Sequence, residues 1–171
     1  MICKLHHSAY RCRNSEETRR FCEDFLGLTH AATLALTETK TSRATTALHT
    51  FYRLGDGSYL AFFEVPDAPF EFKRRHDFDL HIALEVDRST LQVMLDKGAD
   101  LGFEMRGVAD HGFVESIYIR DPNGYVIELC AKSAGHDTSM DPNLNGAREK
   151  LDQWTATTAL PRPDARERAR Y

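Results

Sequence analysis

A weak internal repeat organises residues 5 to 132 of this 171-residue chain. One copy begins with His7-Ser8-Ala9, and the other begins with His81-Ile82-Ala83. In each copy an alternating, strand-like segment is followed by an amphipathic helical pattern and then by further strands. Each half therefore predicts a βαβββ module, and the chain as a whole predicts an α+β fold built from two such modules.

The helical segment of each half has its own start and stop signals. In the first half, Asn14 and Glu17 fit a capping box. In the second half, Ser89 is the expected cap and Gly98 is the expected stop. Each half therefore predicts one amphipathic helix directly after its first strand.

The last strands of the two halves also correspond. The first half closes with GDGSYLAFFEV, a turn followed by a strand that carries Glu64. The second half closes with SIYIRDPNGYVIELC, in which a DPNG turn precedes a strand that carries Glu128. Proline presets one turn angle and Asn-Gly tolerates a positive φ, so DPNG predicts a hairpin.

The repeat divides the chain into four segments. They are a first module (1–69), a linker (70–79), a second module (80–133) and a C-terminal helix and tail (134–171). The linker is charged and is expected to be a solvated connection. In the tail, residues 145–156 predict a short helix whose Trp154 packs on the domain, with a lid or dimer clasp as the alternative. Residues 161–171 are expected to be extended or partly ordered.

Composition excludes several classes of protein. Apolar residues make up 42% of the chain and charged residues 28%, which is typical of a soluble, core-forming protein. The net charge of -4 gives no argument for binding nucleic acid or an anionic membrane, and no apolar run approaches a membrane span. The four cysteines form no CxxC pair and are interpreted as reduced thiols in a cytoplasmic protein.

Two glutamates lie in otherwise apolar strands, where an ionised carboxylate is costly unless it is paired or bound to a metal. Each repeat thus combines a first-strand histidine with a last-strand glutamate. A curved sheet could bring His7, His81, Glu64 and Glu128 together. Such a set suits Fe(II), Mn(II), Ni(II) or Zn(II) better than Ca(II). The alternative is that each histidine is a core residue and each glutamate faces solvent from an edge strand.

The residues HHSAYRCRNSEETRRFCEDFLGL, FDLHIALEVD and SIYIRDPNGYVIEL resemble the vicinal oxygen chelate superfamily. This superfamily groups glyoxalase I, bleomycin and fosfomycin resistance proteins and extradiol ring-cleaving dioxygenases. The resemblance implies two βαβββ modules that form an open, cup-shaped sheet with a divalent metal on its concave side. It implies His7, His81 and Glu128 as metal ligands, with Fe(II) as first choice. Glu64 falls near a fourth position that glyoxalase-like members fill and ring-cleaving enzymes leave open.

The adjacent histidines His6 and His7 receive different roles, because strand alternation places them on opposite faces. The match of His7 to His81 selects His7 as the ligand and leaves His6 on the outer face or at an interface. A slip of one residue would exchange the two roles.

His111 and Tyr118 form a second candidate group. His111 lies in a loop just before the strand that carries Tyr118. Extradiol dioxygenases have a similar histidine and tyrosine facing the substrate. The resemblance implies that His111 takes or delivers a proton and that Tyr118 donates a hydrogen bond. The alternative is a surface-loop histidine and a core aromatic residue.

Three functions follow from the possible ligand sets. Three ligands leave three octahedral positions for two substrate oxygens and O₂, whereas four ligands leave two. Our first expectation is an extradiol-type dioxygenase that cleaves a catechol- or hydroquinone-like ring. The alternative is a glyoxalase-like isomerase or lyase, acting through a metal-bound enediolate with Glu64 as ligand and catalytic residue. The third is a metal-free binding protein of the bleomycin-resistance type. In each case we expect a small-molecule ligand, a homodimer, and no nucleic-acid or membrane partner.

Overall fold

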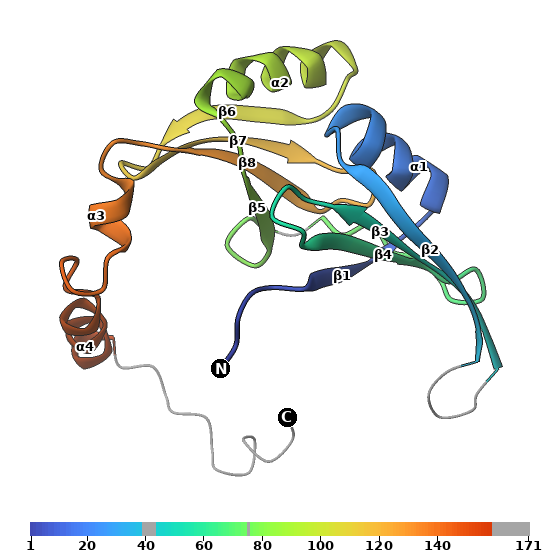
Figure 1. Ribbon diagram of the computed structural model, residues 1–171, viewed down its shortest axis with the longest axis horizontal. Helices are drawn as coiled ribbons and strands as arrows, with labels where there is room; N and C mark the ends of the chain where they lie inside the picture. Colours follow the sequence, from blue (N-terminus) through green and yellow to red (C-terminus); the bar gives the residue numbers. More distant parts are fainter. Residues whose placement is uncertain (39–43, 75, 159–171) are drawn as a thin grey trace.

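The computed structural model describes residues 1–38, 44–74 and 76–158. Its elements follow the chain in the order β1 (His7–Cys12), α1 (Ser15–Arg19), the π-helical turn η1 (Arg20–Phe25), β2 (Thr29–Glu38), β3 (Ala44–Arg53), β4 (Tyr59–Glu64), β5 (His81–Glu85), α2 (Arg88–Asp100), β6 (Met105–Asp110), β7 (Val114–Arg120), β8 (Val126–Lys132), α3 (His136–Met140) and α4 (Ala147–Thr157) (Figure 1).

The strands form two sheets with the same topology. One has the order β1-β4-β3-β2 and the other the order β5-β8-β7-β6. In each sheet the first strand of the module runs parallel to its last strand, and the remaining neighbours are antiparallel. The predicted α+β fold of two βαβββ modules is therefore confirmed.

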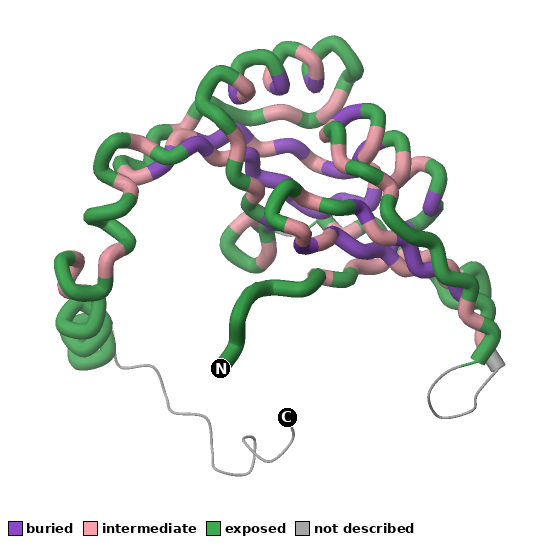
Figure 2. Tube along the Cα trace, in the orientation of Figure 1, coloured by how far each residue is buried: buried purple, intermediate pink, exposed green. Residues whose placement is uncertain are grey.

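Each sheet has one face packed against a helix. Helix α2 lies over β6, β7 and β8 (Figure 1). Beneath the helices, the side chains of Cys12, Phe62, Ile127 and Leu129 belong to a shared buried core. Figure 2 shows this burial concentrated in the strands, while the outward surfaces of the helices are exposed. Since strand residues alternate, the intervening side chains project from the opposite face, which we call the helix-free face of each sheet.

The observed helix ends agree only in part with those predicted from the sequence. The Asn14 side chain accepts a hydrogen bond from the Glu17 backbone at 2.9 Å, which confirms the first cap. The second helix begins after Asp87 instead of Ser89 and continues through Gly98 to Asp100. A Cβ atom at Gly98 would collide with the Met105 side chain, so this glycine allows α2 to pack closely on β6. The expectation that Gly98 ends the helix was wrong for that reason.

The segment 70–79 is anchored to the second module by its backbone. The Lys73 amide donates to the Asn123 carbonyl at 2.8 Å, within the turn that joins β7 to β8. Gly124 in this turn has φ +96°, and a Cβ atom there would lie 2.6 Å from the Lys73 amide nitrogen. Most side chains of the segment are exposed, as expected. Its backbone, however, packs closely over the DPNG turn.

Polar and aromatic contacts hold the two modules together. The Asn123 side chain accepts a hydrogen bond from the Arg13 amide at 2.8 Å and donates one to the Thr18 hydroxyl at 3.2 Å. The ring of Phe25 lies 4.7 Å from that of Phe103, centroid to centroid. The turn of the second module is thereby inserted against the helix of the first.

The C-terminal helix α4 forms over residues predicted to be helical but stays apart from the two sheets (Figure 1). Trp154 is 66% exposed and Leu151 is 56% exposed. The expectation that Trp154 packs on the domain is wrong for this chain. Residues 161–171, expected to be extended, lie outside the described residues.

The described ranges contain no helix that is both long enough and apolar enough to span a membrane. All four cysteines are free thiols, with Cys12 and Cys22 buried, Cys130 half-buried and Cys3 exposed.

Candidate metal centre

His81 and Glu128 meet on the helix-free face of the second module. His81 begins the edge strand β5, and Glu128 lies on the neighbouring strand β8, opposite Ala83. The Nε2 atom of His81 is 3.2 Å from Oε2 of Glu128. The Glu128 side chain is 8% exposed and that of His81 is 42% exposed, so the carboxylate is buried beneath an accessible imidazole.

Both side chains are oriented by further hydrogen bonds. Nδ1 of His81 lies 2.8 Å from the carbonyl oxygen of Asp77 and must donate to it, which leaves Nε2 with a lone pair. The Ser116 hydroxyl donates to Oε1 of Glu128 at 2.5 Å. A histidine that donates its other ring nitrogen to a carbonyl is the usual arrangement of a metal ligand.

The geometry of this pair fits a divalent metal. Two adjacent ligands at about 2.1 Å from an octahedral metal lie about 3 Å apart. The Nε2–Oε2 separation of 3.2 Å matches that value. The donor set, imidazole nitrogen with carboxylate oxygen, suits Fe(II), Mn(II), Ni(II) or Zn(II).

His7 lies on the helix-free face of the first module. Its ring centroid is 5.6 Å from that of Phe51 and 6.3 Å from that of His49. His6 precedes strand β1, so strand alternation does not separate the two neighbours. The Nδ1 atoms of His6 and His7 are 2.8 Å apart and share a hydrogen bond. His6 is thus a hydrogen-bonding partner of His7, a contact that strand alternation did not predict.

Within one chain, His7 does not join the pair in the second module. Among the described residues, no three histidine, cysteine or acidic side chains are close enough together to hold a metal. The structure therefore brings His81 and Glu128 together and leaves His7 on the other module.

Glu64 lies on the helix-covered side of its sheet. In the parallel pairing of β1 with β4, Ala9 lies opposite Ala61, as Ala83 lies opposite Glu128 in the second module. Glu64 is three residues beyond Ala61, an odd offset that turns its side chain to the other face. The expected correspondence between Glu64 and Glu128 was therefore wrong.

The Glu64 carboxylate has a structural partner at its actual position. Its Oε2 accepts a hydrogen bond from the Ser15 amide at 2.6 Å, at the first turn of α1. A carboxylate at a helix N-terminus satisfies a free amide and interacts favourably with the helix dipole. This contact accounts for the acidic residue within the apolar strand.

His111 and Tyr118 form a hydrogen-bonded pair beside Glu128. Nε2 of His111 lies 2.8 Å from the Tyr118 hydroxyl, and Tyr118 is opposite Glu128 in the pairing of β7 with β8. Burial, and next the nearby Glu128 carboxylate, raise the pKa of the Tyr118 hydroxyl above its ordinary value. The phenol therefore stays protonated at neutral pH and can donate a hydrogen bond.

Three further residues on this face were not predicted. Ser116 holds Glu128, and Arg106 on β6 places its guanidinium carbon 4.3 Å from the centre of the Tyr118 ring. Asp77, in the segment before β5, forms an ion pair with Arg106. Strand alternation could have found Ser116, which is two residues from Tyr118. The contacts of Asp77 and Arg106 depend on tertiary structure, for which the sequence carries no comparable signal.

Solved structures provide the comparison with known proteins. A glyoxylase/bleomycin resistance protein/dioxygenase domain from Frankia sp. EAN1pec has a TM-score of 0.62 at 17% identity, covering 78% of this chain and 100% of that one. The fosfomycin resistance protein FosX from Listeria monocytogenes, solved with Mn(II) and sulfate, has a TM-score of 0.60 at 19% identity, covering 80% and 98%. A glyoxalase/dioxygenase from Nostoc punctiforme has a TM-score of 0.59 at 18% identity, covering 76% and 91%.

The chain shares its fold with these glyoxalase/bleomycin resistance/dioxygenase-like structures. No family model and no curated protein matches it by sequence. This fold extends over both βαβββ modules, and His7, His81 and Glu128 all lie on helix-free faces of its sheets.

Proposed function

We propose that this protein is a divalent-metal-dependent enzyme, and that its reaction is the extradiol-type cleavage of a catechol- or hydroquinone-like ring. The observation that carries this proposal is the register of the two modules. It pairs Glu128 with Ala83 in the second module but Ala61 with Ala9 in the first. At the matched first-strand and last-strand positions the two modules thus offer two histidines and one carboxylate, with Ala61 in place of a second carboxylate.

A set of two histidines and one carboxylate is typical of non-haem Fe(II) oxygenases, because it leaves room for both substrate and dioxygen. When bound, Fe(II) supplies electron transfer between a catecholate and dioxygen. The chain's own contribution is to hold the donors: Asp77 fixes the ring nitrogen that His81 presents, and Ser116 fixes the Glu128 carboxylate.

Proton transfer is assigned to the His111–Tyr118 pair. Nε2–H of His111 donates to the Tyr118 hydroxyl at 2.8 Å, which leaves Nδ1 of His111 to accept a proton from a substrate hydroxyl and return it later. Tyr118 donates a hydrogen bond to a substrate oxygen that develops negative charge. Both residues lie on the face that carries Glu128, so they would act beside the ligand pair.

A second copy of the chain is proposed to complete the site. In one chain the edge strands β1 and β5 lie on either side of a cleft of about 800 Å³, whose lining includes Ser8 and Ile82. Among the described residues, neither His7 nor another histidine, cysteine or acidic side chain joins His81 and Glu128 in a group that could hold a metal. In a homodimer, His7 of one copy would approach the His81–Glu128 pair of the other.

Mixing two inactive variants tests this arrangement. His7→Ala and His81→Ala are purified separately, unfolded, and refolded together. If the site lies between copies, the mixed dimer has one intact site, so up to a quarter of the wild-type metal content and activity returns. A site formed within each chain predicts no recovery, because every chain then lacks one ligand.

The alternative reaction is that of a glyoxalase-like isomerase or lyase. It is favoured by the similarity to FosX, a fosfomycin resistance protein that was solved with Mn(II). A site with four protein ligands would require Glu64. This residue lies on the opposite face of its sheet and accepts a hydrogen bond from the Ser15 amide, which argues against such a site. The remaining candidate, a metal-free binding protein, gives no role to the close approach of His81 Nε2 and the buried Glu128 carboxylate.

Two assays separate these reactions. The protein is first loaded with Fe(II) under anaerobic conditions. It is then mixed with each member of a panel of catechols and hydroquinones in oxygenated buffer, and oxygen uptake is recorded. The same protein with Ni(II), Zn(II) or Mn(II) is tested for turnover of methylglyoxal hemithioacetal. We expect oxygen uptake that the Glu128→Gln variant lacks. Hemithioacetal turnover without oxygen uptake would assign the isomerase reaction instead, and a protein that retains no metal would be a binding protein.

A further inference from the structure

Arg106 lies next to the proposed acid–base pair. It belongs to the edge strand β6 and lies opposite Tyr118 in the pairing with β7. Its guanidinium stacks over the Tyr118 ring, with 4.3 Å between the guanidinium carbon and the ring centre. Stacking fixes the plane of an arginine and leaves the N–H groups on its edge free to bind a planar anion.

The guanidinium of Arg106 has unused hydrogen-bonding capacity. Among the residues that the structure describes, Asp77 is the carboxylate that pairs with it. The neighbouring carboxylate, Glu104, is bonded to Arg120 at 3.1 Å and to Arg74 at 3.2 Å. An arginine has five N–H donors, so one carboxylate partner leaves several of them for a ligand. The Arg106 side chain is also 62% exposed.

A cleft lies in front of this arginine. Its volume is about 300 Å³, and its lining includes Asp77, Arg106, Tyr118 and Val126. Val126 lies directly opposite His81 in the pairing of β5 with β8. The cleft thus extends from the guanidinium to the residue that pairs with His81, and its volume is at the lower end of the range for small-molecule sites.

We propose that Arg106 determines substrate specificity by binding a carboxylate carried on the substrate ring. This inference rests on the proposed function and narrows its substrate class to aromatic diols with an anionic substituent. In the free protein Asp77 occupies part of the guanidinium. The substrate carboxylate forms a bidentate pair with the remaining edge of Arg106, or displaces Asp77 from it.

Asp77 has two separable contacts. Its backbone carbonyl accepts the hydrogen bond from Nδ1 of His81, while its side chain pairs with Arg106. The Asp77→Asn variant removes the side-chain charge and keeps the carbonyl. If Arg106 is a binding residue, this variant strengthens carboxylate binding. If the ion pair only supports the fold, it weakens the site instead.

A matched pair of ligands provides the test. 3,4-Dihydroxybenzoate carries a carboxylate, and 3,4-dihydroxybenzamide is similar in shape but uncharged. Their dissociation constants are measured by calorimetry on the full-length, metal-reconstituted protein without oxygen. The wild type, Arg106→Gln, Arg106→Lys and Asp77→Asn are compared. Affinity for the benzamide reports whether each variant keeps an intact site.

We expect the wild type to prefer the benzoate by about 10- to 100-fold. Arg106→Gln should remove this preference by weakening benzoate binding far more than benzamide binding, while Arg106→Lys keeps part of it because a charge remains without the planar fork. Asp77→Asn should increase benzoate affinity several-fold. Equal affinities of the wild type for the two ligands would overturn the proposal. It would also fail if Arg106→Gln weakened both ligands equally, or if Asp77→Asn reduced benzoate binding.

The outcome is separable from that of the proposed function. An Arg106-dependent preference for the benzoate, in a protein that consumes no oxygen, would keep this inference and overturn the dioxygenase assignment. Ring cleavage at equal kcat/KM for both ligands would keep the dioxygenase assignment and overturn the role of Arg106.

Discussion

Ala61 occupies in β4 the position that Glu128 occupies in β8. Each lies opposite the alanine that follows, by two residues, the first-strand histidine of its module. The repeat has therefore kept both histidines and only one carboxylate at equivalent positions. For the proposed metal site, this asymmetry limits the donors to two histidines and one carboxylate, the set on which the proposed reaction depends.

Replacing Glu128 should remove the metal, whereas replacing Glu64 should lower the stability of the fold. Glu128→Gln removes a proposed ligand, so the purified protein should contain almost no metal. Glu64→Gln should keep the metal but lower the free energy of unfolding by about 1–2 kcal/mol, because it weakens the charged hydrogen bond to Ser15. Metal analysis and urea unfolding of both variants check this. Metal loss in Glu64→Gln would restore Glu64 as a fourth ligand.

Replacing either of the two adjacent histidines should weaken metal binding, but by different amounts. His7→Ala should abolish metal retention during gel filtration. His6→Ala should keep the metal with an affinity lower by about 10-fold, because His6 orients the ring of His7 through the shared Nδ1 hydrogen bond. Titration with a competing chelator gives both affinities. Equal loss in the two variants, or a greater loss in His6→Ala, would contradict the assignment of His7.

Disrupting the His111–Tyr118 pair should lower turnover without removing the metal. Tyr118→Phe loses the hydroxyl that contacts His111, and His111→Gln loses the proton acceptor. General acid–base catalysis contributes about 10²–10⁴-fold, so we expect kcat to fall within that range in His111→Gln. Metal content measured on the same samples is the control. An unchanged kcat in both variants would reduce the pair to a structural contact.

The buried Asp121 should make stability depend on pH. Burial raises the pKa of this carboxyl to about 6 in the folded protein, although Asn123 and Tyr125 donate hydrogen bonds to it. The unfolded chain has a pKa of about 3.9. The folded state binds the proton more tightly, so this contribution to stability is complete below about pH 4 and is lost as the pH rises through 6.

The magnitude for Asp121 is on the order of 2 kcal/mol between pH 4 and 7. Urea unfolding across this range should show the slope in the wild type and a smaller one in Asp121→Asn. Asp56 contributes to stability with the opposite pH dependence, because hydrogen bonds from Ser58 hold the pKa of its carboxyl below the ordinary value. The Asp56→Asn variant is therefore the control, and it should keep the slope that Asp121 causes. If Asp121→Asn kept the wild-type slope, another group would be responsible.

Gly124 should tolerate no side chain, for two reasons that add. Its φ of +96° is strained for other residues, and a Cβ atom would lie 2.6 Å from the Lys73 amide nitrogen. We expect Gly124→Ala to cost about 2–4 kcal/mol. Gly102→Ala is the matched control: φ is +75° and no atom lies within 4 Å of its Cβ position, so about 1 kcal/mol is expected. Similar unfolding free energies for the two variants would mean that the linker moves away without cost.

Local pattern predicted the fold well. Alternation in the strands, the Asn14 cap and the DPNG turn are each encoded within a few residues, and all three form as expected. The first-strand histidines were matched correctly because each is followed two residues later by an alanine that pairs with the last strand. That match required no knowledge of how the modules pack.

Register between distant strands was the main source of error. Glu64 and Glu128 lie in similar apolar runs, and the sequence does not show which residue of β4 stands beside Ala9. A shift of three residues turned a proposed ligand into a helix-capping residue. The backbone contact of Lys73 and the exposure of Trp154 were missed for a related reason. Both depend on how distant elements pack, which local composition does not encode.

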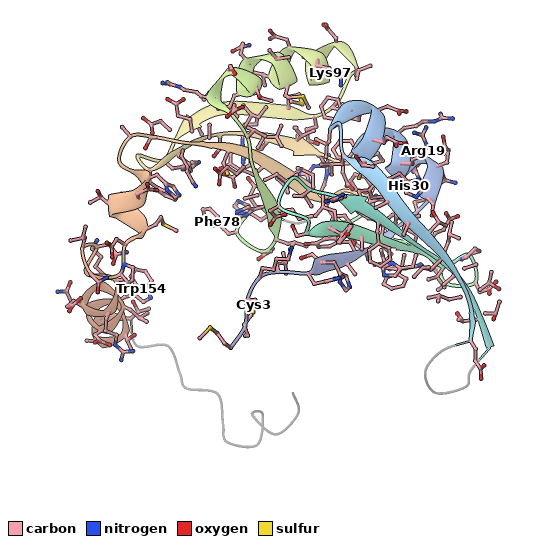
Figure 3. All side chains as sticks on the ribbon, viewed as in Figure 1. Cys3, Arg19, His30, Phe78, Lys97 and Trp154 are labelled. Atoms are coloured by element: carbon pink, nitrogen blue, oxygen red, sulfur yellow. The ribbon has the colours of Figure 1, made fainter. Side chains whose placement is uncertain are left out.

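The side chain of Asn123 has a consequence for how the molecule comes apart. It is buried in the turn of one module, yet it bonds to the Arg13 amide and the Thr18 hydroxyl of the other. Figure 3 shows Lys97 and Arg19 on the two helices whose modules meet here, and Lys97 donates to the Phe25 carbonyl at 2.8 Å. Separating the two modules would leave the buried Asn123 amide without two of its partners. We therefore expect the two modules to unfold together, as one unit, although each has the same topology.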